Sequence, residues 1–269
     1  MKLWMLGSGS DGNAILVECD GSRLLIDCGF GTRTLAGRLK TIDIAPESID
    51  ACLLTHEHWD HIKGAPTGAQ RWGWGVYATP GTAIARELRK TKVQRFTPGA
   101  TLEFPCMTVE AVSMPHDARQ PVGFVVTSRS TGARAGIFHD LGRVTRAVAR
   151  ACETLDLLVI ESNHDDEMLR NGPYPPFLRA RIAGDFGHLS NRHAARFVRE
   201  VATRRLHHLV LAHLSENCNT EQVALTTMRA ALAKSRFRGT LTAAKQDSVV
   251  GPFTPGAMKP EQPIQYSLF

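Results

Sequence analysis

The chain has 269 residues, of which 43% are hydrophobic and 22% are charged, and its formal net charge at pH 7 is +6. These values are ordinary for a soluble globular protein, and a single domain of this length buries roughly 70–75% of its unfolded surface, so a disordered or fibrous chain is excluded. The excess of Lys and Arg leans weakly towards a polyanionic partner.

The cysteines and the N-terminus indicate a cytoplasmic protein. None of the six cysteines forms a C-x-x-C pair, and most lie in apolar runs, so they are predicted to be buried free thiols. The first apolar run stops at Gly7 and is too short for a signal peptide. No stretch approaches the ~20 apolar residues that a membrane span needs, so no membrane contact is expected.

The first part of the chain is predicted to be rich in strands. A first strand is followed by two strands paired around the Asp20-Gly21 turn, a helix and a short buried strand. These elements are expected at residues 3–6, 14–19, 23–28, 31–41 and 51–54. Asp27 comes at the end of the third strand and is expected to hold a His rather than to bind a metal.

A cluster of potential metal ligands follows the buried strand, in the sequence Thr55-His56-Glu57-His58-Trp59-Asp60-His61. His56 and His58 are two residues apart, so an extended backbone aims both imidazoles the same way. Asp60 and His61 are adjacent and come after a bend, so they can face a second point. Four such ligands suit two borderline-soft cations a few Å apart. A solvated loop that holds three His by chance is the less favoured interpretation.

The H-x-H-x-D-H pattern after an apolar strand resembles the signature of the metallo-β-lactamase superfamily. The resemblance implies an α/β fold, the four-layer αβ/βα sandwich of that superfamily, and a binuclear metal site. It also implies that residues 1–245 form one hydrolase domain.

Strands and helices alternate through the rest of this domain. The strands are expected at residues 76–79, 101–114 (two strands), 122–128, 134–138, 155–160 and 206–215. The helices are expected at residues 82–90, 143–152, 191–203 and 220–234, and residues 170–182 are expected to be an irregular Pro-rich loop. The apolar strand 155–160 is predicted to be central and parallel.

Three of these strands end in side chains that can complete the metal site. His116, Asp140 and His213 each follow a predicted strand. His139 precedes Asp140 and is expected to point to the other face of the strand, as a packing residue. The superfamily resemblance then implies that one metal is held by His56, His58 and His116, the other by Asp60, His61 and His213, and that Asp140 bridges them. The His-rich set favours Zn²⁺, and Mn²⁺ or Fe²⁺ use the same ligand types.

Six further segments narrow the resemblance to the YycJ/WalJ-type branch of the superfamily. They read LGSGSxGN, THEHxDHIKG, ESNHD, NGPYP, GHLSN and LAHLSE, and they run from about residue 6 to residue 217. This branch is associated with nucleic-acid hydrolysis, in particular a 5′→3′ DNA exonuclease activity, which implies a role in repair or replication. GHLSN is similar to an element of tRNA 3′-processing nucleases in which a non-ligand His helps the leaving group, so that role is implied for His188.

The expected chemistry is two-metal hydrolysis of a phosphodiester. A hydroxide activated by both metals attacks phosphorus, and this activation depends on Asp60. His188 protonates the departing oxygen. Phosphate contacts are expected from Ser162, Asn163, Ser190 and Asn191, next to a basic helix that follows the nucleic-acid backbone.

The last residues look like a flexible tail with a binding motif. After Lys245 the chain becomes rich in Pro and Gly, so residues 246–269 are expected to lie outside the domain. The ending Gln265-Tyr266-Ser267-Leu268-Phe269 resembles the Q-x-[SD]-L-F motif by which bacterial repair and replication proteins bind the sliding clamp. Leu268 and Phe269 are then apolar anchors, and Gln265 sets the register. The alternative is a tail folded back with Phe269 as a plug.

Two other functions share the same ligand set. The first is a thioester or lactone hydrolase of the same fold, against which the GHLSN segment, the basic balance and the C-terminal motif all count. The second is a non-catalytic binding protein that keeps its metals for folding, against which the intact ligand set counts. Turnover of a phosphodiester, a lactone or a thioester separates these possibilities.

Overall fold

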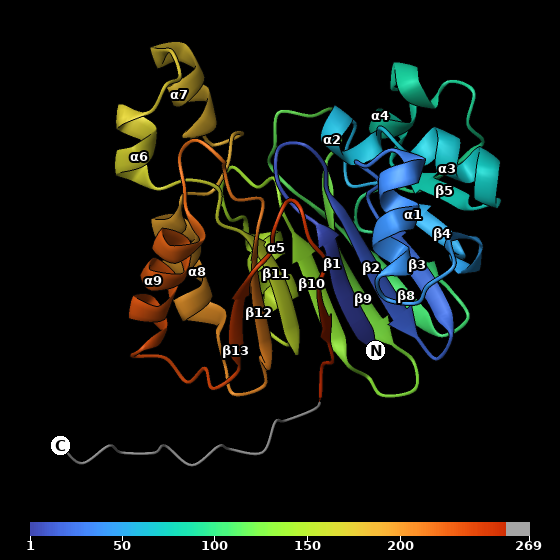
Figure 1. Cartoon of the computed structure of the whole chain (residues 1–269). Coiled ribbons are helices and arrows are strands. Elements are labelled where there is room, and N and C mark those ends of the chain that lie inside the picture. The colour runs from blue at the N-terminus through green and yellow to red at the C-terminus, as the bar shows by residue number, and fades with distance from the viewer. Residues whose placement is uncertain (257–269) are drawn as a thin grey trace.

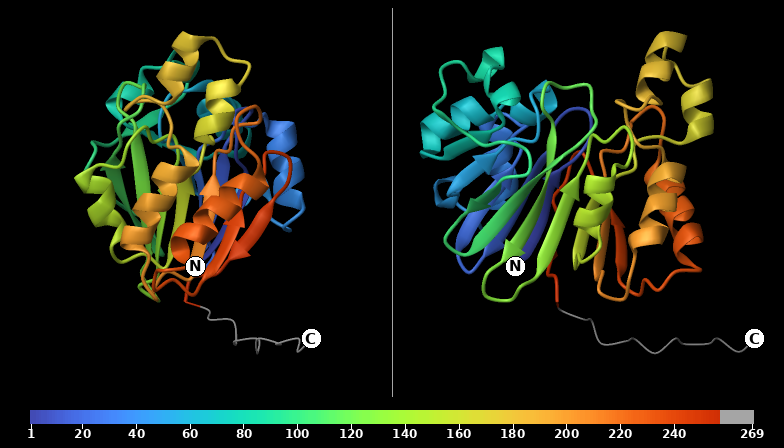
Figure 2. Two further views of the ribbon diagram at one scale, coloured as in Figure 1. Left: turned by 90° about the vertical axis from the view of Figure 1, so that its left-hand side faces the viewer. Right: turned by 180° about the vertical axis from the view of Figure 1, so that it is seen from behind.

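Two seven-stranded β-sheets stand face to face in the computed structural model, which describes residues 1–256, and helices cover both outer faces (Figure 1). The view from behind shows the same four layers, with the helices α6 and α7 rising above one half (Figure 2). The predicted αβ/βα sandwich is therefore confirmed.

The first sheet contains the N-terminal strands and the last one, in the order β14-β1-β2-β3-β4-β5-β6. Their bounds are Lys2–Gly7 (β1), Ala14–Cys19 (β2), Ser22–Ile26 (β3), Ala51–Leu53 (β4), Gly75–Ala78 (β5), Val93–Arg95 (β6) and Val250–Phe253 (β14). β14, β1, β2 and β3 pair antiparallel, whereas β3 to β6 pair parallel.

The second sheet repeats this plan in the order β13-β12-β11-β10-β9-β8-β7. Its strands are Thr101–Glu103 (β7), Met107–Ser113 (β8), Val122–Ser128 (β9), Arg134–Phe138 (β10), Leu157–Glu161 (β11), His208–Ala212 (β12) and Thr240–Ala243 (β13). β7 to β10 pair antiparallel and β10 to β13 pair parallel, so the predicted central parallel strand is β11. Parallel strands end at one edge of a sheet, where ligand sites of α/β proteins form.

The helices lie outside the sheets or at the edge where the parallel strands end (Figure 1). They are Thr32–Lys40 (α1), Trp59–Ile62 (α2), Ala65–Trp72 (α3), Pro80–Ala83 (α4), Arg146–Cys152 (α5), Asp166–Asn171 (α6), Pro176–Ile182 (α7), Asn191–Val201 (α8) and Glu221–Leu232 (α9), with short 3₁₀ turns at Pro46–Ser48 and Arg86–Leu88. Among residues 1–256 none of the helices has the length and apolarity to cross a membrane.

Burial on both faces of the strands explains their nearly continuous apolar sequences. In β2, Ile15 and Val17 belong to the core between the sheets, while Leu16 belongs to the core under the outer helices of the first sheet. Leu35 and Leu39 of α1 lie in that same outer core and are fully buried. Alternate side chains of the strand therefore pack into different cores, and helix side chains four residues apart pack into the outer one.

Two expected elements differ from the structure. Residues 170–182 are mostly helical, in the end of α6 and in α7, and not an irregular loop. Pro176 is the first residue of α7, where a proline costs no hydrogen bond. The helix expected over residues 82–90 is broken: α4 begins earlier, because Thr79 caps it and Pro80 opens it, and it ends at Ala83.

The folded domain also extends beyond its predicted end at residue 245. β14 pairs with β1, with Phe253 opposite Leu3, and Phe253 is buried in the core between the sheets. A Pro- and Gly-rich sequence was expected to leave the sheet, but Pro252 is tolerated because β14 is an edge strand. Gln265, Leu268 and Phe269, the residues of the clamp-like motif, lie outside the described residues.

The packing of Phe253 leads to a stability prediction. Replacing Phe253 by Ala should lower the free energy of unfolding by about 3–5 kcal/mol, because a buried aromatic ring leaves a cavity. Urea unfolding followed by circular dichroism measures this change, with Thr254→Ala as a neighbouring control. Equal midpoints for the two variants would contradict the packing of β14 on β1.

Candidate metal centre

The candidate ligands come from loops that follow strands of both sheets. Residues 54–58 continue β4 in extended form, and His58 is the N-cap of α2, with φ −66° and ψ 149°. α2 then supplies the expected bend, since Asp60 and His61 lie in its single turn. His116, Asp140 and His213 follow β8, β10 and β12.

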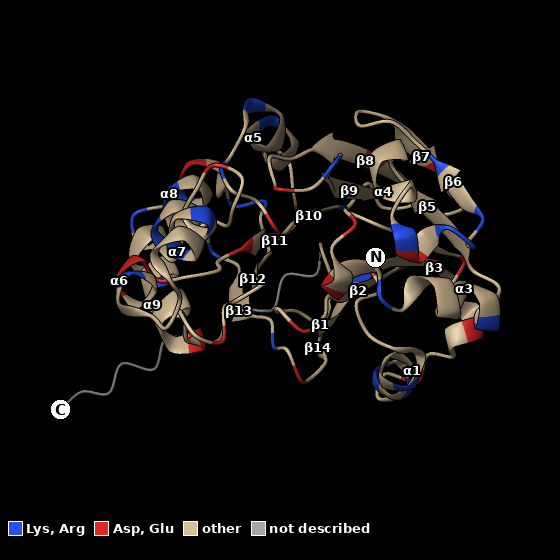
Figure 3. Ribbon diagram, turned by 90° about the horizontal axis from the view of Figure 1, so that it is seen from above, with Lys and Arg blue, Asp and Glu red and all other residues tan. Residues whose placement is uncertain are grey.

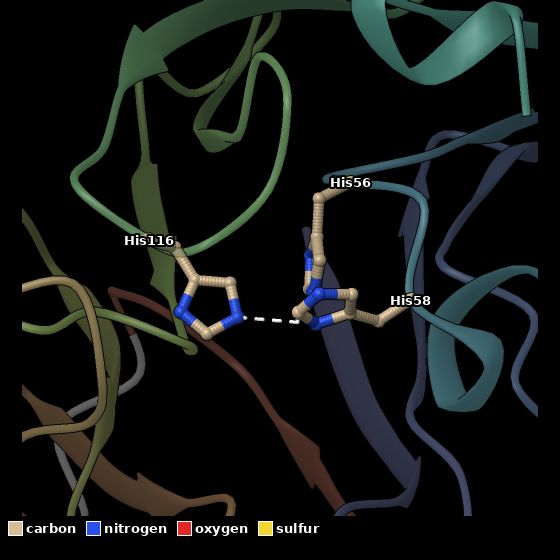
Figure 4. A group of neighbouring side chains, drawn as sticks. All are labelled: His56, His58 and His116. Atoms are coloured by element: carbon tan, nitrogen blue, oxygen red, sulfur yellow. Dashed lines mark hydrogen bonds between the residues drawn. The ribbon is translucent and has the colours of Figure 1, made fainter. Parts of the chain in front are cut away.

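A first group contains three imidazoles. His56, His58 and His116 each offer a ring nitrogen, and these atoms lie within 4.8 Å of one another. His116 Nε2 is 3.2 Å from His58 Nδ1, and Figure 4 shows the His116 ring facing the two other rings from the opposite side. Nε2 of the fully buried His56 has no hydrogen-bond partner.

A second group lies next to the first. Asp60 Oδ2 is 3.2 Å from His61 Nε2 and 3.6 Å from His213 Nε2. Both imidazoles are buried, and Nε2 of His213 has no hydrogen-bond partner.

Asp140 joins the two groups. Its Oδ2 is 2.9 Å from His61 Nε2, and its Oδ1 is 3.2 Å from His213 Nδ1. It also shares a set of close ligand atoms with His56 and His61. The structure thus brings all seven side chains that were predicted as ligands into one buried cluster.

The spacing and the unpaired nitrogens fit divalent cations. Tetrahedral Zn²⁺ with ligand bonds of about 2.0–2.1 Å requires ligand atoms roughly 3.3 Å apart, and the distances of 3.2 Å (His58 to His116) and 3.2 and 3.6 Å (Asp60 to His61 and His213) are close to that value. A buried polar atom without a partner is costly, so the unpaired Nε2 atoms of His56 and His213 indicate a ligand between the side chains.

Four of the five candidate His residues have one ring nitrogen held by the protein, which turns the other towards the cluster. The four contacts are His56 Nδ1 with Thr55 Oγ1 (2.9 Å), His61 Nδ1 with Asp27 Oδ2 (2.8 Å), His116 Nδ1 with the Gly187 carbonyl (3.1 Å) and His213 Nδ1 with Glu161 Oε1 (3.0 Å). Such contacts fix the tautomer and the orientation of metal-binding imidazoles. Asp27 therefore occupies the supporting position expected for it.

Backbone strain is concentrated at the same place. Asp27, Asp140 and His213 have φ values of 60°, 56° and 54°, the left-handed region that non-Gly residues avoid. Each costs about 1–3 kcal/mol and persists where the surrounding structure enforces it. The close approach of chain segments also requires Gly29, because a Cβ there would lie 1.7 Å from the Asp60 carbonyl.

Glu161 is a central residue that the sequence did not reveal. It is fully buried at the end of β11, and its Oε1 lies 2.7 Å from His188 Nδ1 and 3.0 Å from His213 Nδ1. Its Oε2 accepts hydrogen bonds from the backbone N–H groups of Leu141 and Leu189. One carboxylate therefore orients a candidate ligand, the candidate proton donor and two loops. Its position at the end of a buried parallel strand was the available signal.

Electrostatic contacts keep these carboxylates ionised. Burial raises the pKa of Glu161, but the neighbouring His188 and His213 outweigh it and bring that pKa down to about 2. Burial likewise opposes ionisation of Asp140, yet His213 and His61 hold its pKa well below the usual range. Burial lowers the pKa of His213, but the nearby carboxylates of Asp140, Asp60 and Glu161 outweigh it and raise that pKa to about 10.

The imidazoles differ in charge. Burial, and then His61, lower the pKa of His56, and burial lowers that of His116. These two rings are neutral and keep a lone pair for a cation. The pKa of His188 is raised, because the contact with Glu161 outweighs its burial.

Asn13 is a second supporting residue, and no role in the site was expected for it from the sequence. Its Nδ2 donates to Asp60 Oδ2 at 3.2 Å, and its Oδ1 accepts hydrogen bonds from Ser8 Oγ and from the N–H of Gly9. Ser8 Oγ in turn accepts from the N–H of His213. The Gly-rich turn after β1 therefore ties Asp60 to the last candidate ligand.

The expectation for His139 was wrong. β10 ends at Phe138, so the alternation of a strand no longer applies to the next residue. The His139 ring is buried in the site, 3.1 Å from Asp140 Oδ2 and stacked on His61 with 5.1 Å between ring centroids.

The four expected phosphate contacts are also placed differently. Ser162, Asn163, Ser190 and Asn191 are at most 6% exposed. Ser162 Oγ donates to Asn191 Oδ1, Asn163 Nδ2 donates to the His213 carbonyl, and Ser190 caps α8. These side chains hold the site's loops together, and in this structure they do not face a substrate.

Comparison with known proteins assigns the chain to a family. A family model described as the beta-lactamase superfamily domain matches residues 22–214. The chain belongs to the metallo-β-lactamase superfamily. It is 34% identical to the exodeoxyribonuclease WalJ of Streptococcus pneumoniae, a match that covers 87% of this chain and 89% of that protein. It is 32% identical, with the same coverage, to the exodeoxyribonuclease YycJ of Bacillus anthracis.

Similarity to a solved structure supports the fold, but not the function. The metallo-β-lactamase fold protein YhfI from Bacillus subtilis superposes with a TM-score of 0.68 at 19% identity, covering 93% of this chain and 99% of that one. The His and Asp clusters of this hydrolase fold are groups that could hold divalent metal ions.

Proposed function

We propose that this protein is a metal-dependent phosphodiesterase that removes nucleotides from DNA, as a 5′→3′ exonuclease in repair or replication. The observation that carries the proposal is the arrangement of two ligand groups joined by Asp140, with His188 beside them on Glu161. The names of the similar proteins, both exodeoxyribonucleases, support DNA as the substrate.

Two divalent cations fit the cluster. His56, His58 and His116 would hold one, Asp60, His61 and His213 the other, and Asp140 both; the His-rich set favours Zn²⁺ over Mn²⁺ or Fe²⁺. When bound, such cations polarise a phosphoryl oxygen and make water a nucleophile at neutral pH.

The protein's own residues complete the reaction. Glu161 Oε1 holds Nδ1 of His188 at 2.7 Å, which leaves Nε2 to carry a proton. The His188 side chain is 22% exposed whereas Glu161 is fully buried, so the imidazole is the member of this pair that a substrate can reach. From there it can give its proton to the oxygen that leaves phosphorus. Asp60 is held by Asn13 and gives the second group its carboxylate.

A small-molecule hydrolase of the same fold is the alternative function, since a lactone or thioester would use the same cations. A dedicated proton donor counts against a thioester, because the alkoxide leaving group of DNA needs protonation far more than a thiolate does. The net charge of +6 also favours a polyanionic substrate.

The test is degradation of duplex DNA labelled at the 5′ or the 3′ end, with added Zn²⁺ or Mn²⁺. We expect metal-dependent release of mononucleotides from the 5′ end, and none from an Asp60→Ala variant, which loses a contact to both His61 and His213. Release from the 3′ end would reverse the polarity. Hydrolysis of a lactone or thioester, with no cleavage of DNA or RNA under any metal, would overturn the proposal.

A further inference from the structure

Three exposed aromatic side chains lie on segments that contain or contact residues of the candidate site. Within residues 1–256 the exposed large apolar side chains are Trp59, Ile84, Phe177 and Phe186, and three of the four are aromatic. A single exposed apolar residue is common and requires no explanation. These three aromatics, however, all belong to segments that also carry residues of the metal cluster or are bonded to it.

Trp59 interrupts the metal motif itself. It stands between His58 and Asp60 as the first residue of α2, and it is 58% exposed. The Lys63 ammonium lies 6.0 Å from the centre of its ring. The indole of Trp59 can stack on a nucleic-acid base, and the Lys63 ammonium beside it can attract the adjoining phosphate.

Phe186 holds the matching position in the second half of the molecule. It lies in a tight turn closed by a hydrogen bond from Gly187 N–H to the Gly184 carbonyl, two residues before His188, and is 58% exposed. The same loop is packed against the Asp140 loop, because a Cβ on Gly142 would lie 2.3 Å from the Asp185 carbonyl. This close packing holds the turn in place, with the Phe186 ring at the surface.

Phe177 lies on α7, which is tied to the metal cluster. It is 75% exposed. Arg181 of the same helix pairs with Asp117, whose Oδ1 lies 3.3 Å from His116 Nε2. Figure 3 looks onto this end of the molecule, with α7 on the left and α4 on the right, and part of the α7 ribbon is blue, the colour of Lys and Arg. The aromatic residues thus come from both halves, at the end where the parallel strands stop.

We propose that Trp59, Phe177 and Phe186 form a stacking rim that holds unpaired bases at the end of a DNA strand while its phosphate enters the metal cluster. The inference rests on the proposed nuclease function and adds that the strand is engaged single-stranded at its end. Flat rings stack on any base, so the rim binds without sequence preference. The neighbouring cations Lys63 and Arg181 suit the polyanionic backbone of the same strand.

The test compares two DNA strands of about twelve nucleotides, within the usual site sizes for single strands. Both carry phosphorothioate linkages against cleavage, and in one the terminal bases are replaced by abasic sites. Fluorescence anisotropy gives Kd for the metal-loaded protein. Each of Trp59→Ala, Phe177→Ala and Phe186→Ala should weaken binding of the normal strand about five-fold or more. The abasic strand should bind more weakly and be insensitive to the same changes.

Controls separate stacking from other effects. Ile84→Ala removes an equally exposed apolar side chain, 52% accessible, and should leave Kd unchanged. Trp59→Phe should keep most of the affinity. Because Trp59 adjoins two candidate ligands, metal content is measured for its variants, and Phe177 and Phe186 test the rim without that risk.

The outcomes are distinct. Equal losses on both strands, no loss on either, or a wild type that binds neither strand would overturn the stacking rim. Alanine variants that change the sedimentation of the protein but not its Kd would also overturn it and assign the aromatics to a second copy of the chain. Cleavage of end-labelled DNA is scored separately, so intact cleavage with unchanged Kd rejects the rim alone, whereas absent cleavage rejects the proposed function.

Discussion

Replacing Asp140 by Asn is expected to lower kcat/KM for DNA by at least about 10³-fold. The change keeps the size of the side chain and removes its charge, which faces His61 Nε2 at 2.9 Å and His213 Nδ1 at 3.2 Å. Asn also tolerates the φ of 56° at this position, so folding should be retained. A bridging carboxylate that holds two cations supports several kcal/mol of transition-state stabilisation, which corresponds to this factor.

Asp43→Asn is the matched control for this experiment. Asp43 has the same φ of 56°, is exposed, and lies just after α1 rather than in the metal cluster. Metal content by mass spectrometry and kcat/KM on end-labelled DNA are measured for both variants. We expect loss of bound metal and of activity for Asp140→Asn and neither for Asp43→Asn. Full activity of Asp140→Asn would contradict the proposal that Asp140 binds the metals.

Replacing His188 by Ala should reduce kcat on DNA by about 10²–10⁴-fold, the usual contribution of a general acid. The reason is the contact of its Nδ1 with Glu161, which leaves Nε2 for the leaving oxygen. A phosphodiester with a p-nitrophenyl leaving group needs little protonation, so its hydrolysis should fall much less. The difference between the two substrates distinguishes a proton donor from a merely structural residue.

His193→Ala serves as the control for His188. His193 is exposed on α8, and its described contact to the site is the backbone hydrogen bond to the Ser190 cap. Its removal should leave both substrates unaffected. Equal losses on DNA and on the p-nitrophenyl ester for His188→Ala would contradict the proton-donor role and indicate a damaged metal site instead.

The sequence was informative where the chemistry is local. Four of the seven candidate ligands occur within six residues, His56 to His61, so their spacing alone indicates a metal site. The others could be placed because each follows an apolar strand. For Asp140 and His213 these strands, β10 and β12, pair parallel with β11, and parallel strands end at a common edge. The structure gathers all seven in one cluster.

Other features of the site depend on segments that are distant along the chain. Glu161 and Asn13 lie in the ESNHD and LGSGSxGN segments, but nothing in the sequence shows that they contact His188, His213 and Asp60. The position of His139 was misjudged because the strand rule was applied one residue past the end of β10.

The expected phosphate contacts were also wrong because the sequence does not show which polar side chains are buried. Ser162 and Asn191 look like available hydroxyl and amide groups in the sequence, but they hydrogen bond to each other in the interior. The C-terminal boundary moved for a similar reason, since β14 lacks strand character in its sequence and is held by pairing with β1.

By itself, the sequence indicated the ligand types through short patterns of apolar and ligating residues, and its resemblance to a known superfamily implied the fold class and the grouping of the ligands around two points. The tertiary structure alone decided which groups orient those ligands, which polar side chains are buried, and which aromatic rings are exposed. Those properties arise when loops from two sheets meet, and no local pattern encodes which atoms of distant segments will then be within hydrogen-bonding distance.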